Sequence, residues 1–184
     1  MQNIVIGGSA GSFQTVTAIL SSIPRNYPHA IFLCLHRLKN VRGGFVEALS
    51  LKSNIPISEP YDKDTVMPGI AYLAPANYHM YVDANNQFSL STEEPINHSR
   101  PSIDVTFCSI AKTFKQNSIG ILLSGANKDG AVGLKAIKDA GGTVIVQHPD
   151  ECQVKTMTTA AIKITEVDHI LFTNDIIDFL KNLK

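Results

Sequence analysis

The sequence has no excess of charge of either sign, because 16 Lys and Arg residues balance 16 Asp and Glu residues. A nucleic-acid-binding surface needs clustered cations, and here residues 36–42 form only a weak basic cluster. Long hydrophobic runs are also missing, since none approaches the roughly 18 apolar residues that a transmembrane helix requires. We therefore expect neither a nucleic-acid partner nor direct insertion into a membrane.

Cysteine is scarce, and a targeting segment is missing. The three cysteines, Cys34, Cys108 and Cys152, cannot all pair, and no two of them form a C-x-x-C motif. Reduced thiols are the ordinary state of such cysteines inside a cell. No basic segment precedes the first apolar run, so we expect no signal peptide. These features predict a cytoplasmic protein, and a length of 184 residues predicts one domain over residues 1–184.

Motifs that bind metals, dinucleotides or nucleotide phosphates are missing as well. The histidines follow no metal-binding spacing such as H-E-x-x-H; those considered are His79, His98, His148 and His169. The glycine-rich segment at residues 7–12 reads Gly-Gly-Ser-Ala-Gly-Ser. It has neither the G-x-G-x-x-G of a dinucleotide site nor the Gly-Lys-Ser/Thr end of a P-loop. We expect no metal ion and no organic cofactor.

What the sequence does contain is an alternation of short apolar runs with helical stretches. Strands are expected at residues 3–7, 30–35, 70–74, 78–82, 88–91, 119–124, 143–146 and 170–173. Helices are expected at residues 12–21, 44–51, 102–113, 129–140, 157–162 and 174–181. Apolar strands separated by helices indicate βαβ units and a parallel sheet. Residues 83–86, Asp-Ala-Asn-Asn, indicate an antiparallel hairpin in or beside that sheet.

A serine follows the first predicted strand in a setting typical of a nucleophile. Ser9 stands in the pattern G-x-S-x-G, between an apolar strand and a predicted helix. The glycines allow a sharp turn, and the free N–H groups of the following helix point toward the same place. A serine hydroxyl needs a histidine as its base, and a carboxylate orients that histidine. The pattern therefore predicts both partners nearby.

The predicted strand ends supply these partners. His36 follows the second strand, and Asp129 lies in the segment after the buried strand at residues 119–123. Functional groups of open α/β sheets collect at the carboxyl ends of the strands, so Ser9, His36 and Asp129 form a candidate catalytic triad. Their chain order, Ser then His then Asp, differs from the Ser-Asp-His order of the α/β-hydrolases, and we do not expect that fold.

Each of the three residues also has a structural explanation. Ser9 could cap a helix, and His36 could be a satisfied histidine at a strand end. Asp129 could stabilise the N-terminus of its own helix through the helix dipole. Taken singly, each structural role is commoner than the catalytic one. Three matching residues at three strand ends together favour catalysis.

Motifs spread over almost the whole chain add a family resemblance. They are residues 6–11, His36 after an apolar strand, residues 67–75 (Met-Pro-Gly-Ile-Ala-Tyr-Leu-Ala-Pro), 78–80 (Tyr-His-Met), 100–105 (Arg-Pro-Ser-Ile-Asp-Val), 120–125 (Gly-Ile-Leu-Leu-Ser-Gly) and 129–134 (Asp-Gly-Ala-Val-Gly-Leu). In this order they resemble the catalytic domain of the protein-glutamate methylesterases of bacterial chemotaxis, the CheB family. The resemblance implies an α/β fold with a doubly wound, mainly parallel sheet flanked by helices, and its triad falls on Ser9, His36 and Asp129.

The resemblance also implies a reaction and partners. The family hydrolyses glutamyl γ-methyl esters on methyl-accepting chemotaxis receptors to glutamate and methanol, and can deamidate receptor glutamines by the same acyl chemistry. The backbone N–H groups of Ala10 and Ala126 would bind the oxyanion, where the family usually has threonine and methionine. A receptor methyltransferase is a second candidate partner. Family members commonly carry an N-terminal phospho-receiver domain, which this sequence lacks, so we expect no regulation by phosphorylation in cis.

Arg100 is predicted to help bind the receptor. It stands just before a helix start, with Pro101 or Ser102 near the cap, where the helix dipole does not favour a cation. A solvated surface arginine is the structural alternative. Two other functions remain open for the whole chain: a non-catalytic adaptor with this fold, docked on a receptor or a methyltransferase, and a serine hydrolase of another ester.

Overall fold

The computed structural model describes residues 1–37 and 44–183 and contains a seven-stranded parallel sheet in the order β3-β4-β2-β1-β7-β8-β9. The strands are β1 (Asn3–Gly8), β2 (Ala30–Leu35), β3 (Ile57–Ser58), β4 (Ala71–Leu73), β7 (Ser118–Leu122), β8 (Thr143–Gln147) and β9 (His169–Leu171). The chain builds outward from β1 on one side and later crosses to β7 on the other. This topology confirms the predicted doubly wound sheet, with its switch point at the carboxyl ends of β1 and β7.

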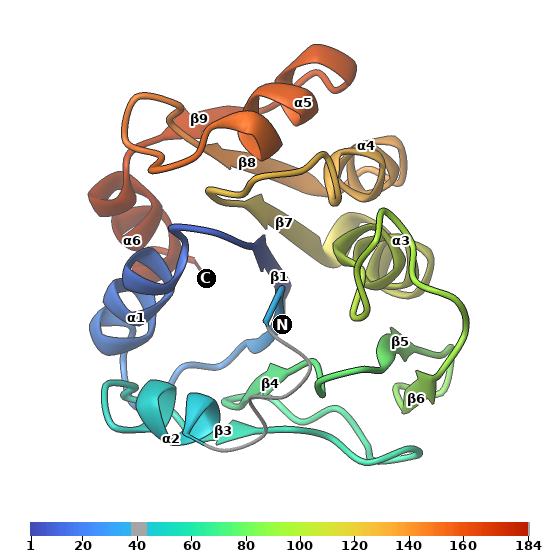
Figure 1. Ribbon diagram of the computed structural model, residues 1–184. Helices are drawn as coiled ribbons and strands as arrows, with labels where there is room; N and C mark the ends of the chain where they lie inside the picture. Colours follow the sequence, from blue (N-terminus) through green and yellow to red (C-terminus); the bar gives the residue numbers. More distant parts are fainter. Residues whose placement is uncertain (38–43, 184) are drawn as a thin grey trace.

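Helices cover both faces of the sheet (Figure 1). One face carries α1 (Phe13–Ser22), α2 (Phe45–Ser50) and α6 (Thr173–Lys181), and the other carries α3 (Ile103–Phe114), α4 (Ala131–Asp139) and α5 (Thr156–Ile164). In β1, Ile4 and Ile6 join the core beneath α1, whereas Val5 joins the core beneath α3. Successive strand side chains point to opposite faces, so a strand covered on both sides is apolar along most of its length.

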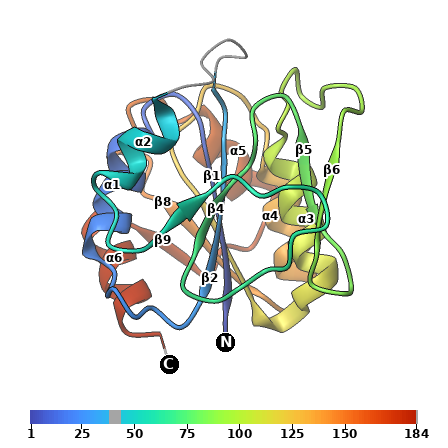
Figure 2. The same ribbon diagram turned by 90° about the horizontal axis from the view of Figure 1, so that it is seen from below.

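The predicted hairpin lies beside the parallel sheet and is not part of it. β5 (His79–Val82) and β6 (Phe88–Ser91) form a separate antiparallel pair next to α3 (Figure 2). The turn between them closes through a hydrogen bond of 2.9 Å from Asp83 N–H to the carbonyl of Gln87. Ser109 of α3 bonds both the N–H and the carbonyl of Val82, at 2.7 and 3.0 Å. These bonds fix the hairpin to the helix.

All the predicted strands and helices are present, with shifted ends that have local causes. α4 begins at Ala131 and not at residue 129, because Gly130 adopts a left-handed φ of +94° as its N-cap. β7 ends at Leu122, and the N–H of Ser124 donates to the side chain of Gln147 at 3.0 Å. The two-residue strand β3 and a 3-10 turn at Lys115–Asn117 were not predicted, because neither is long enough to show a periodicity.

The structure bears on the prediction about membrane insertion but leaves most of the weak basic cluster untested. Within the described residues, no helix is both long enough and apolar enough to cross a bilayer. Most of the weak basic cluster falls in residues 38–43, which lie outside the described residues.

Candidate active site

The sheet topology brings the three predicted triad segments to one edge. β1 lies between β2 and β7, so the segments that leave these three strands run side by side. The N–H of His36 donates to the carbonyl of Gly8 at 3.1 Å, and the N–H of Ser9 donates to the carbonyl of Ser124 at 2.9 Å. Ser9 therefore lies between the strand end that carries His36 and the loop that leads to Asp129.

The turn after β1 carries the Ser9 side chain, which has no hydrogen-bond partner in the part of the chain that the structure describes. α1 begins at Phe13 with Ser12 as its N-cap residue, so the explanation of Ser9 as the helix cap is wrong. Ser12 Oγ donates to the carbonyl of Ser9 at 2.7 Å and holds the turn closed. Gly11 has a φ of +83°, and a Cβ there would lie 2.9 Å from Ser124 Oγ. Within residues 1–37 and 44–183, the half-buried Ser9 hydroxyl makes no hydrogen bond.

His36 and Asp129 are in direct contact. His36 Nε2 lies 2.8 Å from Asp129 Oδ2, and the two side chains are 13% and 0% exposed. Because a carboxylate only accepts, Nε2 carries the proton of this bond and Nδ1 keeps a free lone pair. Nδ1 lies 3.4 Å from Ser99 Oγ. In the described part of the chain, no hydrogen bond joins Ser9 to His36, so the structure brings these two residues to adjoining strand ends without bonding them.

Asp129 serves the N-terminus of α3, not that of its own helix. Its carboxylate accepts from Ser102 Oγ at 2.8 Å, from Ile103 N–H at 2.7 Å and from Asp104 N–H at 3.1 Å. Burial acts to raise the pKa of Asp129, but the bonds from His36 and from the start of α3 outweigh it and hold this pKa below its ordinary value. The dipole of α3 favours the same charge. The predicted dipole explanation therefore names the wrong helix.

The predicted oxyanion donors are exposed. Among the residues that the structure describes, the N–H groups of Ala10 and Ala126 donate to no protein acceptor, and both residues are exposed. Ser124 ties their loops together, because its hydroxyl donates to the carbonyl of Ala10 at 2.7 Å. The N–H of Gly125 donates to the carbonyl of Val154 at 2.9 Å. Two backbone donors are thus left free on fixed loops near Ser9.

Arg100 is bound to its own chain. Its guanidinium donates to Asn77 Oδ1 at 2.9 and 3.3 Å, and to the carbonyls of Thr92 and Glu93 at 2.5 and 2.9 Å. The side chain therefore joins the loop after β4 to the loop after β6. The surface-arginine explanation is wrong, since the residue is half-buried and well bonded.

Two contacts of the site were missed by sequence reasoning. Asn97 Nδ2 donates to Asp129 Oδ1 at 3.2 Å, and Ser99 lies against His36. Both residues stand in a loop without periodicity, where no sequence signal marks them. Ser102 was expected as a cap, and its cap role is confirmed by a bond from Val105 N–H, but its bond to Asp129 was not expected.

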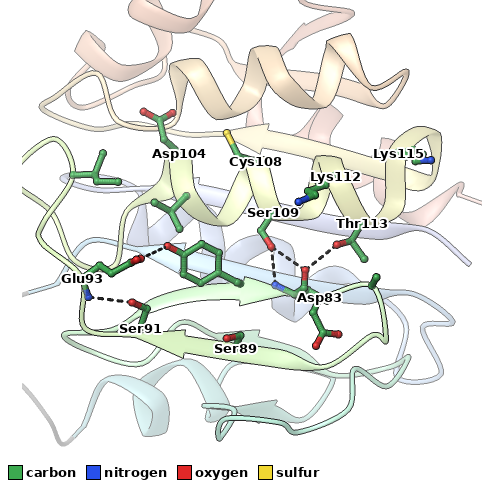
Figure 3. Close-up of a pocket in the computed structure, with 15 residues that line it drawn as sticks. Asp83, Ser89, Ser91, Glu93, Asp104, Cys108, Ser109, Lys112, Thr113 and Lys115 are labelled. Carbon is green, nitrogen blue, oxygen red and sulfur yellow. Dashed lines mark hydrogen bonds between the residues drawn. The ribbon is translucent and has the colours of Figure 1, made fainter.

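A pocket of about 1040 Å³ lies elsewhere, between α3 and the β5–β6 hairpin. None of Ser9, His36 and Asp129 lines it. Figure 3 shows Asp104 and Cys108 on its α3 wall and Glu93 on its hairpin side. Tyr81, which also lines the pocket, donates to Glu93 at 2.8 Å. The groups described as candidates for chemistry therefore lie outside this pocket, at the edge of the sheet.

Comparisons with known proteins agree with this fold. The family model described as CheB methylesterase matches residues 4–180. The crystal structure of the Thermotoga maritima CheB methylesterase catalytic domain aligns with a TM-score of 0.94 at 30% identity, covering 100% of this chain and 98% of that chain. A relative from Leptospira interrogans is 39% identical over 168 residues, covering 91% of this chain and 87% of the relative.

Two longer relatives carry the name protein-glutamate methylesterase/protein-glutamine glutaminase. The Clostridium acetobutylicum protein is 32% identical, over 97% of this chain and 52% of its own length. The Salmonella typhimurium protein is 34% identical, over 91% of this chain and 49% of its own length. The chain thus spans about half the length of these two relatives.

Proposed function

The chain belongs to the CheB methylesterase family, whose named relatives are carboxylic ester hydrolases, and we propose that it hydrolyses glutamyl γ-methyl esters on chemotaxis receptors. The products are receptor glutamate and methanol. The bond of 2.8 Å between His36 and the fully buried Asp129, next to Ser9 at the switch point of the sheet, is the observation that carries the proposal.

In the proposed reaction, Ser9 Oγ attacks the γ-carbonyl carbon and His36 takes the serine proton. The proton goes to Nδ1, because Nε2 already donates to Asp129. His36 then protonates the departing methoxide, which leaves as methanol. Water attacks the acyl-Ser9 ester with His36 again as base, and glutamate and free Ser9 are released. Deamidation of glutamine follows the same steps with ammonia as the leaving group.

The remaining groups support the charges that form during these steps. The buried, ionised Asp129 stabilises the imidazolium of His36. The free N–H groups of Ala10 and Ala126 are the proposed donors to the oxyanion. Since these are backbone groups, the alanines do not remove them. Arg100 remains a proposed contact of the receptor, acting through the two loops that it joins.

Methanol release from a methylated receptor fragment tests the proposal directly. We expect methanol and free glutamate from the native chain, none from Ser9→Ala, and labelling of Ser9 by a fluorophosphonate located by peptide mass spectrometry. A chain that binds the fragment but releases no methanol and takes no label is an adaptor. Labelling with hydrolysis of small esters alone indicates a different ester substrate. A receptor methyltransferase remains a proposed partner, and a pull-down assay with the two purified proteins tests this binding.

A further inference from the structure

Two carboxylates lie together beneath the site. Asp129 is fully buried, and Asp104 is 8% exposed. The amide nitrogen of Asn97, Nδ2, donates to both of them, at 2.9 Å to Asp104 Oδ2 and at 3.2 Å to Asp129 Oδ1. Two like charges that lie close enough to share one hydrogen-bond donor disfavour each other's ionisation. A buried pair of carboxylates often retains one shared proton. The proposed reaction needs Asp129 ionised and makes no use of Asp104.

Each of the other hydrogen-bond donors named here reaches only one of the two carboxylates. Asp129 alone accepts from His36, Ser102 Oγ and Ile103 N–H. Asp104 alone accepts from Gly133 N–H, at 2.7 Å. In the described residues, Asn97 is the side chain whose N–H groups reach both carboxylates, and its two amide hydrogens match the two acceptors.

The backbone around Asn97 is held in an uncommon conformation. Asn97 and His98 have φ values of 51° and 63°, and the turn is closed by hydrogen bonds in both directions between Ile96 and Ser99. Asparagine tolerates the left-handed region better than most residues. The Asn97 carbonyl also lies 3.5 Å from Asn127 Nδ2, on the loop that leads to Asp129. These contacts aim the amide at the carboxylate pair.

We propose that Asn97 is a positioning residue that lets Asp104 and Asp129 remain ionised side by side, so that Asp129 stays available to His36. The inference rests on the proposed function, because it gives Asp129 its role there. Loss of the shared donor strengthens the repulsion within the pair. A proton then binds the pair at higher pH, and a proton shared with Asp104 weakens the charge that Asp129 presents to the imidazolium.

Several titratable groups surround the two carboxylates. Burial, followed by the charge of Asp129, raises the pKa of Asp104 above its ordinary value, whereas the pKa of Asp129 is lowered. The charges of the pair act on the buried Cys34 of β2 and the exposed Cys108 of α3, and desolvation followed by these charges raises the pKa of both thiols. α4 contributes the N–H of Gly133.

The hairpin contributes one further titratable group, His79 on β5. Its Nδ1 accepts from Ser102 N–H at 3.2 Å, and its Nε2 lies 3.1 Å from the carbonyl of Glu94. Both ring nitrogens are therefore occupied by neighbours other than the carboxylates.

Asn97→Gly and Asn97→Asp test the proposal, because glycine and aspartate both tolerate the left-handed backbone. We expect the part of the acid limb of kcat/KM that the carboxylate pair sets to move up by about one pH unit in Asn97→Gly, and further in Asn97→Asp, which adds a third carboxylate. If the turn has only a structural role, the maximal kcat/KM should fall while the midpoint of its pH profile stays unchanged. The pH profile of Asn97→Asp should then be nearly native. His98→Gly is the matched control, since it alters the same turn and is expected to leave the midpoint unchanged.

A second measurement needs no turnover. The ¹³C carboxyl signals of labelled aspartate report the titration of Asp104 and Asp129 directly, and their midpoints should rise in both Asn97 variants. Unchanged midpoints in NMR and in kcat/KM overturn the inference. If Ser9→Ala keeps its activity while the carboxyl midpoints still move, the proposed function fails and the role of Asn97 in the carboxylate pair stands.

Discussion

The two halves of the candidate site differ in how firmly they are held. Within the described residues, the fully buried Asp129 carboxylate accepts five hydrogen bonds, whereas the half-buried Ser9 hydroxyl makes none. The N–H groups of Ala10 and Ala126, on the Ser9 side, are likewise free in that part of the chain. The base side of the site is thus assembled in advance, and the side that would meet the carbonyl is open.

This difference follows from what each half must do. A carboxylate buried beneath a histidine needs fixed donors, because desolvation without them would favour its neutral form. Donors for an oxyanion must stay unoccupied until the tetrahedral intermediate forms. Substitutions on the open side should therefore remove activity without loss of stability, whereas substitutions on the buried side should lower both.

Ser9→Ala should have the largest effect on activity. Loss of a nucleophile in a Ser-His-Asp triad lowers kcat by about 10⁶, while the substitution removes no hydrogen bond that the Ser9 side chain makes within residues 1–37 and 44–183. We expect no detectable methanol release and a melting temperature close to native. Ser21→Ala, at the far end of α1, is the control and should keep full activity. Near-normal turnover in Ser9→Ala would eliminate the serine mechanism.

Asp129→Asn should follow, with a fall in activity of about 10⁴ and a loss of stability of about 1–3 kcal/mol. The amide nitrogen replaces either Oδ2, which accepts from Ile103 and His36, or Oδ1, which accepts from Asp104, so donors at that position lose their acceptor. Activity assays and urea unfolding at pH 7 measure the two effects. Asp139→Asn removes an exposed carboxylate near the end of α4 and serves as the control. A variant that unfolds more easily yet hydrolyses esters at the native rate would leave Asp129 a purely structural role.

The sequence was sufficient for the frame of this site and insufficient for its buried side. Continuous apolar runs and strand-end polar residues predicted the sheet and the neighbourhood of Ser9 and His36, because parallel strands end at one edge. The contacts of Asp129 depend on how α3 meets the loop after β7, across 25–27 residues of chain. Asn97 lies in an irregular loop, where periodicity carries no information. Tertiary packing, which has no local signature, decides both.

Lowering the pH should gradually remove the contribution of the buried Asp129 carboxylate to the unfolding free energy, and it should not change the effect of Ser9 on the open side. The pKa of folded Asp129 is lowered from an unfolded value of about 3.9. Its ionised form therefore stabilises the native chain fully above that value, and this contribution is lost as pH falls through the folded pKa. The difference in unfolding free energy between native chain and Asp129→Asn should be constant from pH 7 to about 5 and shrink below about pH 4. A difference that does not change with pH would contradict this assignment, and Ser9→Ala should follow the native curve throughout.

Arg100→Ala should have the smallest effect on chemistry, because Arg100 lies in neither half of the triad. Its bonds to Asn77, Thr92 and Glu93 join two loops, so their loss should lower the unfolding free energy by about 1–3 kcal/mol. If those loops meet the receptor, KM for a receptor fragment should rise several-fold, with kcat and the hydrolysis of a small ester nearly unchanged.

A conservative variant distinguishes a direct contact of the Arg100 charge with the receptor from an effect of Arg100 on the position of the two loops. Arg100→Lys retains the charge but cannot reproduce the planar fork that reaches both loops. A contact made by the charge alone predicts a nearly native KM for Arg100→Lys, whereas positioning of the loops predicts a KM close to that of Arg100→Ala. Arg25→Ala removes an exposed arginine elsewhere and controls for net charge. The internal bonds of the guanidinium favour the second outcome. An unchanged KM in both Arg100 variants would show that Arg100 takes no part in receptor binding, and it would not affect the roles proposed for His36, Asp129 and Ser9.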